Sequence, residues 1–122
     1  MPPEFFSYLA CAYSDPDPTV KLERERVYNE VDAMLSSAGF MIVSPMLKLP
    51  VCRAGKFPDD WAYWQTYSLR MIEMCLEVIV IVSEGWQKSI GLRGEIDHAE
   101  SLGIPVRYYM PGLGFIDAPT IA

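Results

Sequence analysis

The sequence predicts a doubly wound α/β sandwich, in which helices cover both faces of a parallel sheet. Segments typical of strands and of helices follow one another in the order βαβ–loop–αβαβ, and this alternation implies parallel strands joined by right-handed crossovers. The segment EVIVIV, residues 77–82, is rich in β-branched residues and does not alternate, as expected of a strand buried on both faces. At 122 residues, the whole chain (1–122) is long enough for one domain with a hydrophobic core.

The first half of the chain is predicted to form a strand, a helix and a second strand. The aromatic-rich segment 5–13 is bounded by turn residues and is typical of a strand. Asp17 and Pro18 are expected to be the N-cap and first residue of the helix, and Gly39 is expected to end it. The segment FMIVS, residues 40–44, is the second strand. Four apolar residues at helical spacing mark the expected buried face of the helix: Val27, Val31, Met34 and Ala38.

The second half is predicted to contain a loop, two helices and two strands. Residues 45–59 include three prolines without periodicity and are predicted to be a loop, whose length suggests a functional reason. Asp59 is expected to be the N-cap of the next helix. After the strand at 77–82 come a helix at 91–103 and a strand at 104–110. The apolar stripe of the helix that follows Asp59 comprises Trp61, Trp64, Ser68, Met71 and Cys75.

The predicted fold also indicates where a ligand would bind. In doubly wound sheets, ligands lie beyond the carboxyl ends of the strands, near the switch in strand order. The segments 10–15, 44–60 and 83–95 are expected to converge at that rim. We therefore expect the functional residues there.

The composition limits the classes of partner. The formal net charge of −6 argues against a general binder of DNA or RNA, but allows a single nucleotide in a local pocket. The longest aliphatic run, residues 78–82, is far shorter than the roughly 20 residues of a membrane span. The first twenty residues lack Lys and Arg, so no signal peptide is expected. The three cysteines lack metal-ligand spacing and are typical of reduced thiols in a cytosolic protein.

Glu95 is the first candidate for a reactive group. It falls in the first turn of the predicted helix, on a stripe with Ala99 and Leu102 that should face the sheet. The helix dipole there favours an ionised carboxylate by ~0.3–1 kcal/mol. An ionised, oriented carboxylate in an apolar rim could attack a sugar carbon. Acidic residues are also common in first turns simply because they stabilise helices, so spacing alone leaves both interpretations open.

The turn before Glu95, GWQKSIGLRG at residues 85–94, has the composition of an anion-binding segment. Three glycines, Lys88, Ser89 and Arg93 at a helix start could hold a phosphate. The segment is not a P-loop, because the Gly-Lys-Ser/Thr signature is absent. A solvated surface loop would have the same composition.

The aromatic residues of DDWAYWQTY, residues 59–67, could stack on a nucleobase or could be ordinary core. Ser68 is a small polar residue on the buried stripe, where only a hydrogen bond would offset the cost of burial. His98, the single histidine, is expected to be an exposed helix residue. No Ser/His/Asp, Cys/His or metal-ligand constellation occurs, so we expect no metal site.

Three segments resemble the nucleoside 2-deoxyribosyltransferase-like superfamily. YLACAY, residues 8–13, resembles its first strand and turn, and SIGLRGEIDHA…LGIPV resembles its glycine-x-glycine-x-x-glutamate segment with the alanine and glycine-x-proline that follow. The residues from DDWAYWQTY to EVIVIV resemble the helix and strand before that segment. YSDPDP and the Trp-rich helix resemble a small, often phage-encoded branch. The resemblance covers roughly residues 7–110.

This resemblance implies a flavodoxin-like fold with a four- to five-stranded parallel sheet, and cleavage of N-glycosidic bonds in 2′-deoxynucleosides or nucleotides. Glu95 matches the nucleophile that attacks C1′ of the deoxyribose, and Tyr8 matches the tyrosine that orients it. Ser89 matches the serine with which monophosphate-hydrolysing members contact the 5′-phosphate, where nucleoside transferases carry an aspartate. A nucleotide is therefore favoured over a nucleoside.

Two positions depart from the family pattern. Ser68 replaces the aspartate that protonates or holds the leaving base, and Leu76 replaces the aspartate that usually precedes the third strand. Loss of a general acid typically lowers the rate by ~10²–10⁴-fold. Three explanations remain open. Asp60 or a water bound to Ser68 replaces the missing general acid, or the leaving base needs no proton, or the protein no longer converts a substrate.

Three function classes therefore remain: a glycosidase or deoxyribosyltransferase, a catalytically silent nucleotide-binding protein, and a structural or partner-binding domain. For the first two we expect Glu95 and Tyr8 at the reaction centre, a small-molecule ligand, no cofactor, no nucleic-acid polymer and no membrane. Either the second helix or the apolar tail at 111–122 is expected at the contact of a homo-oligomer, most simply a two-fold dimer. The expected substrate-binding residues are Ala10, Tyr13, Asp60, Trp64, Ser68, Lys88, Ser89, Gly91 and Arg93.

Overall fold

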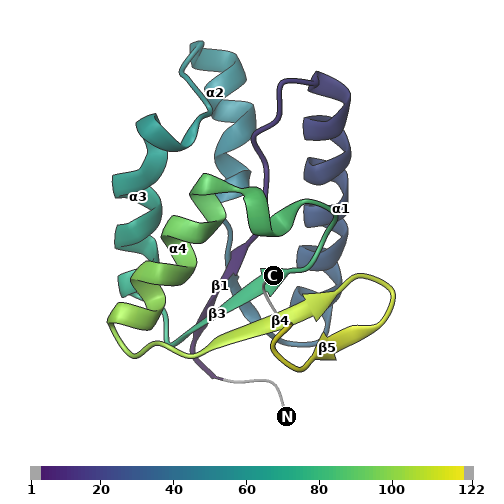
Figure 1. Ribbon diagram of the computed structural model, residues 1–122, viewed down its shortest axis with the longest axis vertical. Helices are drawn as coiled ribbons and strands as arrows, with labels where there is room; N and C mark the ends of the chain where they lie inside the picture. The colour runs from purple at the N-terminus through teal and green to yellow at the C-terminus, as the bar shows by residue number, and fades with distance from the viewer. Residues whose placement is uncertain (1–3, 120–122) are drawn as a thin grey trace.

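The middle layer of the molecule is a five-stranded sheet with the strand order β2-β1-β3-β4-β5 (Figure 1). The computed structural model describes residues 4–119. The first four strands are parallel, and β5 is antiparallel to β4. The predicted doubly wound, flavodoxin-like α/β fold is thus confirmed, with a sheet that is mostly rather than wholly parallel. The strands are β1 (Phe6–Ala10), β2 (Met41–Val43), β3 (Glu77–Ile81), β4 (Val106–Met110) and β5 (Gly114–Ile116).

Helices cover both faces of this sheet. The face formed by Tyr8, Ala10, Val78 and Val80 packs on α3 and α4. The opposite face packs on α1 and on the short helices that follow β2. The α-helices are α1 (Pro18–Ser37), α2 (Leu49–Gly55), α3 (Trp61–Glu73) and α4 (Ile90–Ser101), and the 3-10 helices are η1 (Pro45–Lys48) and η2 (Trp86–Lys88).

The ends of α1 agree with the sequence prediction, and its buried face agrees in part. Asp17 is the N-cap and Pro18 the first residue, while Gly39 follows the helix with a φ of 99°. Met34 is 55% exposed and Ala38 is also exposed. Val31 is buried as predicted and Val27 packs against the core, while Tyr28 and Leu35 take the other buried positions. Tyr28 can face inward because its hydroxyl donates to the Leu9 carbonyl oxygen (2.8 Å) and accepts from Ser44 Oγ (2.9 Å).

The segment predicted to be a loop contains η1 and α2. Two of its three prolines, Pro45 and Pro50, stand at the starts of these helices, where proline is tolerated because the first N–H groups have no acceptor within the helix. Both helices are too short to show a helical periodicity in the sequence. The prediction of an irregular loop at 45–59 was therefore wrong, although the segment does reach the predicted rim.

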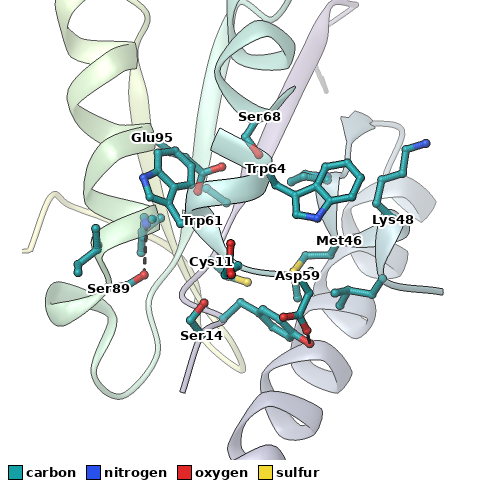
Figure 2. Close-up of a pocket in the computed structure, with 18 of the residues that line it drawn as sticks. Cys11, Ser14, Met46, Lys48, Asp59, Trp61, Trp64, Ser68, Ser89 and Glu95 are labelled. Atoms are coloured by element: carbon teal, nitrogen blue, oxygen red, sulfur yellow. Dashed lines mark hydrogen bonds between the residues drawn. The ribbon is translucent and has the colours of Figure 1, made fainter. Parts of the chain in front are cut away.

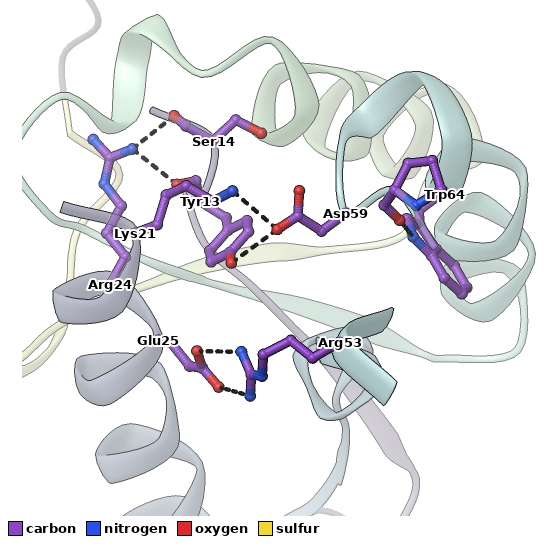
Figure 3. A network of polar contacts seen from close by, with 9 residues as sticks. Tyr13, Ser14, Lys21, Arg24, Glu25, Arg53, Asp59 and Trp64 are labelled. Carbon is purple, nitrogen blue, oxygen red and sulfur yellow. Dashed lines mark hydrogen bonds and ion pairs between the residues drawn. The ribbon is translucent and has the colours of Figure 1, made fainter. Parts of the chain in front are cut away.

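The predicted N-cap of α3 was wrong by one residue. Asp60, not Asp59, is the N-cap, and its carboxylate accepts from the Tyr63 N–H at 2.9 Å. Asp59 is turned toward α1 and the chain after β1, where it accepts from Lys21 Nζ (2.9 Å) and Tyr13 Oη (3.2 Å) (Figure 3). The two adjacent carboxylates thus have different structural roles.

Part of the apolar tail that was expected at an oligomer contact packs against the chain's own sheet. Residues 114–116 form the edge strand β5, where Phe115 packs edge-on against Tyr109 at 5.2 Å between ring centroids. The Arg107 guanidinium lies 4.1 Å from the Phe115 ring centroid and also pairs with the buried Glu77. The tail prediction also covers residues 120–122, which lie outside the described residues. Within residues 4–119, no helix combines the length and apolar character needed to cross a bilayer.

Candidate functional site

A cleft of about 600 Å³ opens beyond the carboxyl end of β1 (Figure 2). The chain after β1, the helices after β2, the start of α3 and the start of α4 all contribute to its walls. This is the convergence that the sequence predicts for the rim of the sheet. The cleft is lined by nine of the eleven predicted site residues: Ala10, Tyr13, Asp60, Trp64, Ser68, Lys88, Ser89, Gly91 and Glu95.

Glu95 and Tyr8 form a buried contact between two side chains at this site. Glu95 projects from α4, is only 6% exposed and lines the cleft. Tyr8 projects from the centre of β1, is fully buried and donates its hydroxyl hydrogen to Glu95 Oε2. Tyr8 is not among the lining residues, so it acts on the cleft through Glu95. This contact fixes the direction of the carboxyl group.

The electrostatic expectation for Glu95 was wrong. The helix begins at Ile90 rather than Gly91, with Ser89 as N-cap, so Glu95 lies in its second turn, where the dipole acts weakly. Burial raises the pKa of Glu95 to about 8, and the hydrogen bond from Tyr8 opposes part of that rise. At pH 7 roughly one carboxyl in ten is ionised. Leu102 is also not on the buried stripe, because it lies past the last helical residue and is 51% exposed.

Ser68 is connected to the same pair of residues. It lies on α3, is 6% exposed and lines the cleft. Burial is the largest cause that raises the pKa of Tyr8, while the nearby Ser68 side chain lowers it. Ser68, Tyr8 and Glu95 thus bring α3, β1 and α4 together at the wall of the cleft.

The predicted phosphate seat is only partly assembled. Ser89 Oγ accepts from the Leu92 N–H at 3.2 Å, and Ser89 and Lys88 both line the cleft. Gly91 lies in the first turn of α4, whose leading N–H groups have no acceptor within the helix. Arg93 does not line the cleft: its Nη1 lies 3.8 Å from Asp97 Oδ1 on the surface of α4. The prediction that Arg93 contacts the ligand is not supported by this geometry.

Sequence reasoning missed Lys48, a second cation of the cleft. Its ammonium group lies 5.6 Å from the centroid of the Tyr67 ring, and both residues line the cleft. Figure 2 shows Lys48 and Ser89 on opposite sides of the cleft. The signal was hidden because Lys48 lies in the proline-rich segment that was predicted to be irregular.

Sequence reasoning also missed a polar network that holds the mouth of the cleft (Figure 3). Arg24 of α1 donates to the carbonyl oxygens of Tyr13 (3.3 Å) and Ser14 (3.0 Å). Asp59 receives hydrogen bonds from Lys21 and Tyr13, and burial together with Asp59 raises the pKa of Tyr13 to about 12. The loop after β1 is therefore fixed to α1 and to the start of α3.

The fold and the cleft define a flavodoxin-like α/β protein with a buried carboxyl group in the wall of a small-molecule-sized cleft. The chain belongs to the family described as a domain of unknown function (DUF1937), whose model matches residues 6–110. That match spans the sheet through β4 and includes Tyr8, Ser68 and Glu95. The description names no activity, so it leaves the resemblance to the deoxyribosyltransferase-like superfamily open. No curated protein matches the chain.

Proposed function

We propose that this protein cleaves or transfers the N-glycosidic bond of a (deoxy)nucleotide, with Glu95 as the nucleophile at C1′. The observation that supports this proposal best is the contact between Glu95 and Tyr8 in the cleft wall. A carboxyl group is rarely buried without a charged partner, and such positions are enriched at functional sites. Tyr8 holds one carboxyl oxygen, which leaves the other for reaction with a ligand.

The chemistry has two steps. The Glu95 carboxylate forms a bond to C1′ while the bond from C1′ to the base nitrogen breaks, and the electron pair leaves with the base. In hydrolysis the oxygen of a water molecule then attacks C1′, and in transfer the nitrogen of a second base does so. Either attack breaks the bond between Glu95 and C1′ and releases the carboxylate, and the proton that the attacking group loses neutralises the departed base. Only the ionised form of Glu95 can start this sequence, so burial limits the rate at neutral pH.

The start of α4 supports a phosphorylated substrate. The N–H groups of Ile90 and Gly91 begin the helix, and Lys88 lies just before them. An anion at such a position gains hydrogen bonds from the backbone and from a cation. We propose that this segment binds the 5′-phosphate and places C1′ toward Glu95.

No carboxylic acid of the cleft is in an obvious position to protonate the leaving base. Ser68 cannot supply a proton as a carboxylic acid would, and the Asp60 carboxylate is engaged as the N-cap of α3. We therefore propose that the base leaves without help from a protein carboxyl group, or with a water held by Ser68. Turnover should then be slow, by about 10²–10⁴-fold relative to an enzyme with a general acid.

A second function is favoured by the same two facts. A Glu95 that stays protonated and a Ser68 in place of an acid would suit a nucleotide-binding protein without turnover. A protonated carboxyl group donates a hydrogen bond to a ligand instead of attacking it. Such a protein would sequester its nucleotide.

One panel of ligands separates these functions. The protein is incubated at pH 8 with deoxynucleosides, ribonucleosides and their 5′-monophosphates, and free base is measured by chromatography while calorimetry measures binding. Base release supports the glycosidase. Binding without release supports sequestration, and neither binding nor release would contradict both proposals in favour of a structural domain.

We also propose that the protein is a cytoplasmic homo-oligomer. Its three cysteines are free thiols, as expected in a reducing compartment. The outer surface of α3 and the segment before it expose aromatic side chains, including Tyr63 at 52% and Phe57 at 48%. Covering these side chains with a second copy would remove apolar surface from water.

A further inference from the structure

The indole of Trp61 lies directly on the first two turns of α4. A Cβ atom added to Gly94 would be 2.6 Å from Trp61 Cζ2, and one added to Gly91 would be 3.3 Å from Trp61 Cε3. No side chain fits at Gly94 unless the indole ring moves. A side chain at Gly91 would make a tight contact with the same ring. The spacing of these two glycines, which from the sequence alone suggests an anion site, therefore also matches the footprint of an indole ring.

This ring lies beside the reactive carboxyl group. Gly91 and Glu95 are four residues apart, so they share one face of α4, and Gly94 directly precedes Glu95. Trp61 and Glu95 both line the cleft, and Figure 2 shows them together although they come from α3 and α4. The ring thus packs on α4 at the residue before Glu95 and on the turn that precedes it.

We propose that Trp61 is a positioning residue that shields Glu95 from water. Gly91 and Gly94 are glycines because a side chain at either position would crowd the indole of Trp61. The role assigned to Glu95 rests on the proposed function, but the shield is a property of the protein without ligand. An apolar ring that excludes water disfavours the ionised carboxyl group. Trp61 therefore controls how readily Glu95 becomes a nucleophile.

The other ionisable groups near Glu95 do not supply charge to offset this effect. Tyr8 of β1, Cys11 after β1 and Tyr28 of α1 all have their pKa raised, in each case chiefly by burial, so they are neutral at pH 7. Charged groups of the same cleft are Lys48, Asp59, Asp60 and Lys88. The causes that set the pKa of Glu95 are burial and the Tyr8 hydrogen bond. Water access is thus the property that a change at Trp61 alters.

The test is a carboxyl titration by NMR on protein labelled with ¹³C at the glutamate side-chain carboxyl, with Glu95→Gln used to assign the signal. We expect the midpoint for Glu95 to fall by about one pH unit or more in Trp61→Ala, which is about a tenfold rise in the ionised fraction at neutral pH. Trp64→Ala, the same change one turn later on α3, is the matched control and should shift the midpoint less. An unchanged midpoint in Trp61→Ala, or an equal shift in Trp64→Ala, would overturn the proposal.

Gly94→Ala provides a second route if Trp61→Ala does not fold. Alanine is favourable within a helix, so this variant keeps α4 and retains the indole but displaces it. We expect the Glu95 midpoint to fall and the tryptophan emission to move to longer wavelength. A displaced emission with an unchanged midpoint would contradict the shield. Because no substrate is used, this result is independent of the proposed glycosidase: absence of base release would count against that activity alone.

Discussion

Glu95 is the residue at which folding and reactivity conflict. Its pKa is about 8 in the folded protein because burial disfavours the charged form, whereas an unfolded chain would have the ordinary value of 4.5. The folded state therefore retains a proton that the unfolded state releases between these two pH values. Stability from this group is complete below the unfolded pKa and is lost as the pH rises to about 8.

This conflict predicts how Glu95→Gln affects thermal stability. The amide keeps the shape of the side chain and cannot ionise, so the variant should not lose this part of its folding stability as the pH rises. We expect the melting temperatures of wild type and variant to be similar near pH 5, and the variant to melt several degrees higher near pH 8.5, since a pKa difference of one corresponds to about 1.4 kcal/mol. Calorimetric scans across this range make the measurement. Parallel pH dependences of the two proteins would show that Glu95 is not desolvated.

Tyr8→Phe should change the pH dependence of catalysis rather than only its rate. The Tyr8 hydroxyl group lowers the pKa of Glu95, so its removal should raise that pKa further above the ordinary value. We expect the rising limb of base release against pH to move to higher pH, and activity at pH 7 to fall roughly tenfold if the limb moves by about one pH unit. The plateau at high pH serves as the internal reference. A limb that moves to lower pH would contradict the role given to Tyr8.

At this scale, the sequence indicates which residues matter better than it indicates their state. Glu95, Tyr8 and Ser68 could be selected from motifs and stripes, and they do come together. The protonation state of Glu95 could not be predicted, because burial depends on β1 and α3, which are distant in the sequence. The N-cap of α3 was predicted at Asp59 and lies at Asp60 for a similar reason. In the sequence the two adjacent carboxylates look equivalent, and only the folded structure shows that Lys21 and Tyr13 bind Asp59.

The start of α4 is the element that should distinguish a nucleotide from a nucleoside. Lys88 and the first N–H groups of α4 face the cleft, whereas Arg93 faces Asp97. We expect a 5′-phosphate to strengthen binding about tenfold or more, and Lys88→Ala to remove much of this gain. Arg93→Ala removes the same charge from a nearby position on α4 outside the cleft and should leave the gain intact. Isothermal calorimetry with a nucleoside and its monophosphate makes the comparison, and equal affinities would eliminate the phosphate seat.

Elements with strong local signals were predicted well. Asp17, Pro18 and Gly39 delimit α1 as expected, because caps depend on residues adjacent in the sequence. The short helices η1 and α2 were missed because helices of seven residues or fewer show no reliable helical periodicity, and the edge strand β5 was missed as well. Lys48 was missed with them. The parts of the site that lie on long, periodic elements were therefore predicted, and the wall formed by short helices was not.

At the scale of the whole molecule, the surface that we propose for assembly is the outer side of α3. Its exposed aromatic side chains support an oligomer, whereas β5 covers the sheet edge next to β4. We expect multi-angle light scattering at micromolar concentration to give about twice the 13.8 kDa mass of the chain, and Tyr63→Glu to shift it toward the monomer. A monomer mass for the wild type across this range would contradict the proposed assembly and leave each cleft to be closed by its own chain.

The most direct test of the central claim compares base release by wild type and Glu95→Gln. Both proteins are incubated at pH 8.5, where most of the Glu95 carboxyl is ionised, with the panel of deoxynucleoside 5′-monophosphates, and circular dichroism verifies that both are folded. We expect free base from at least one nucleotide with the wild type and none above background with the variant, because the amide retains the shape and lacks the nucleophile. Base release by the variant at a rate near that of the wild type would contradict the assignment of Glu95.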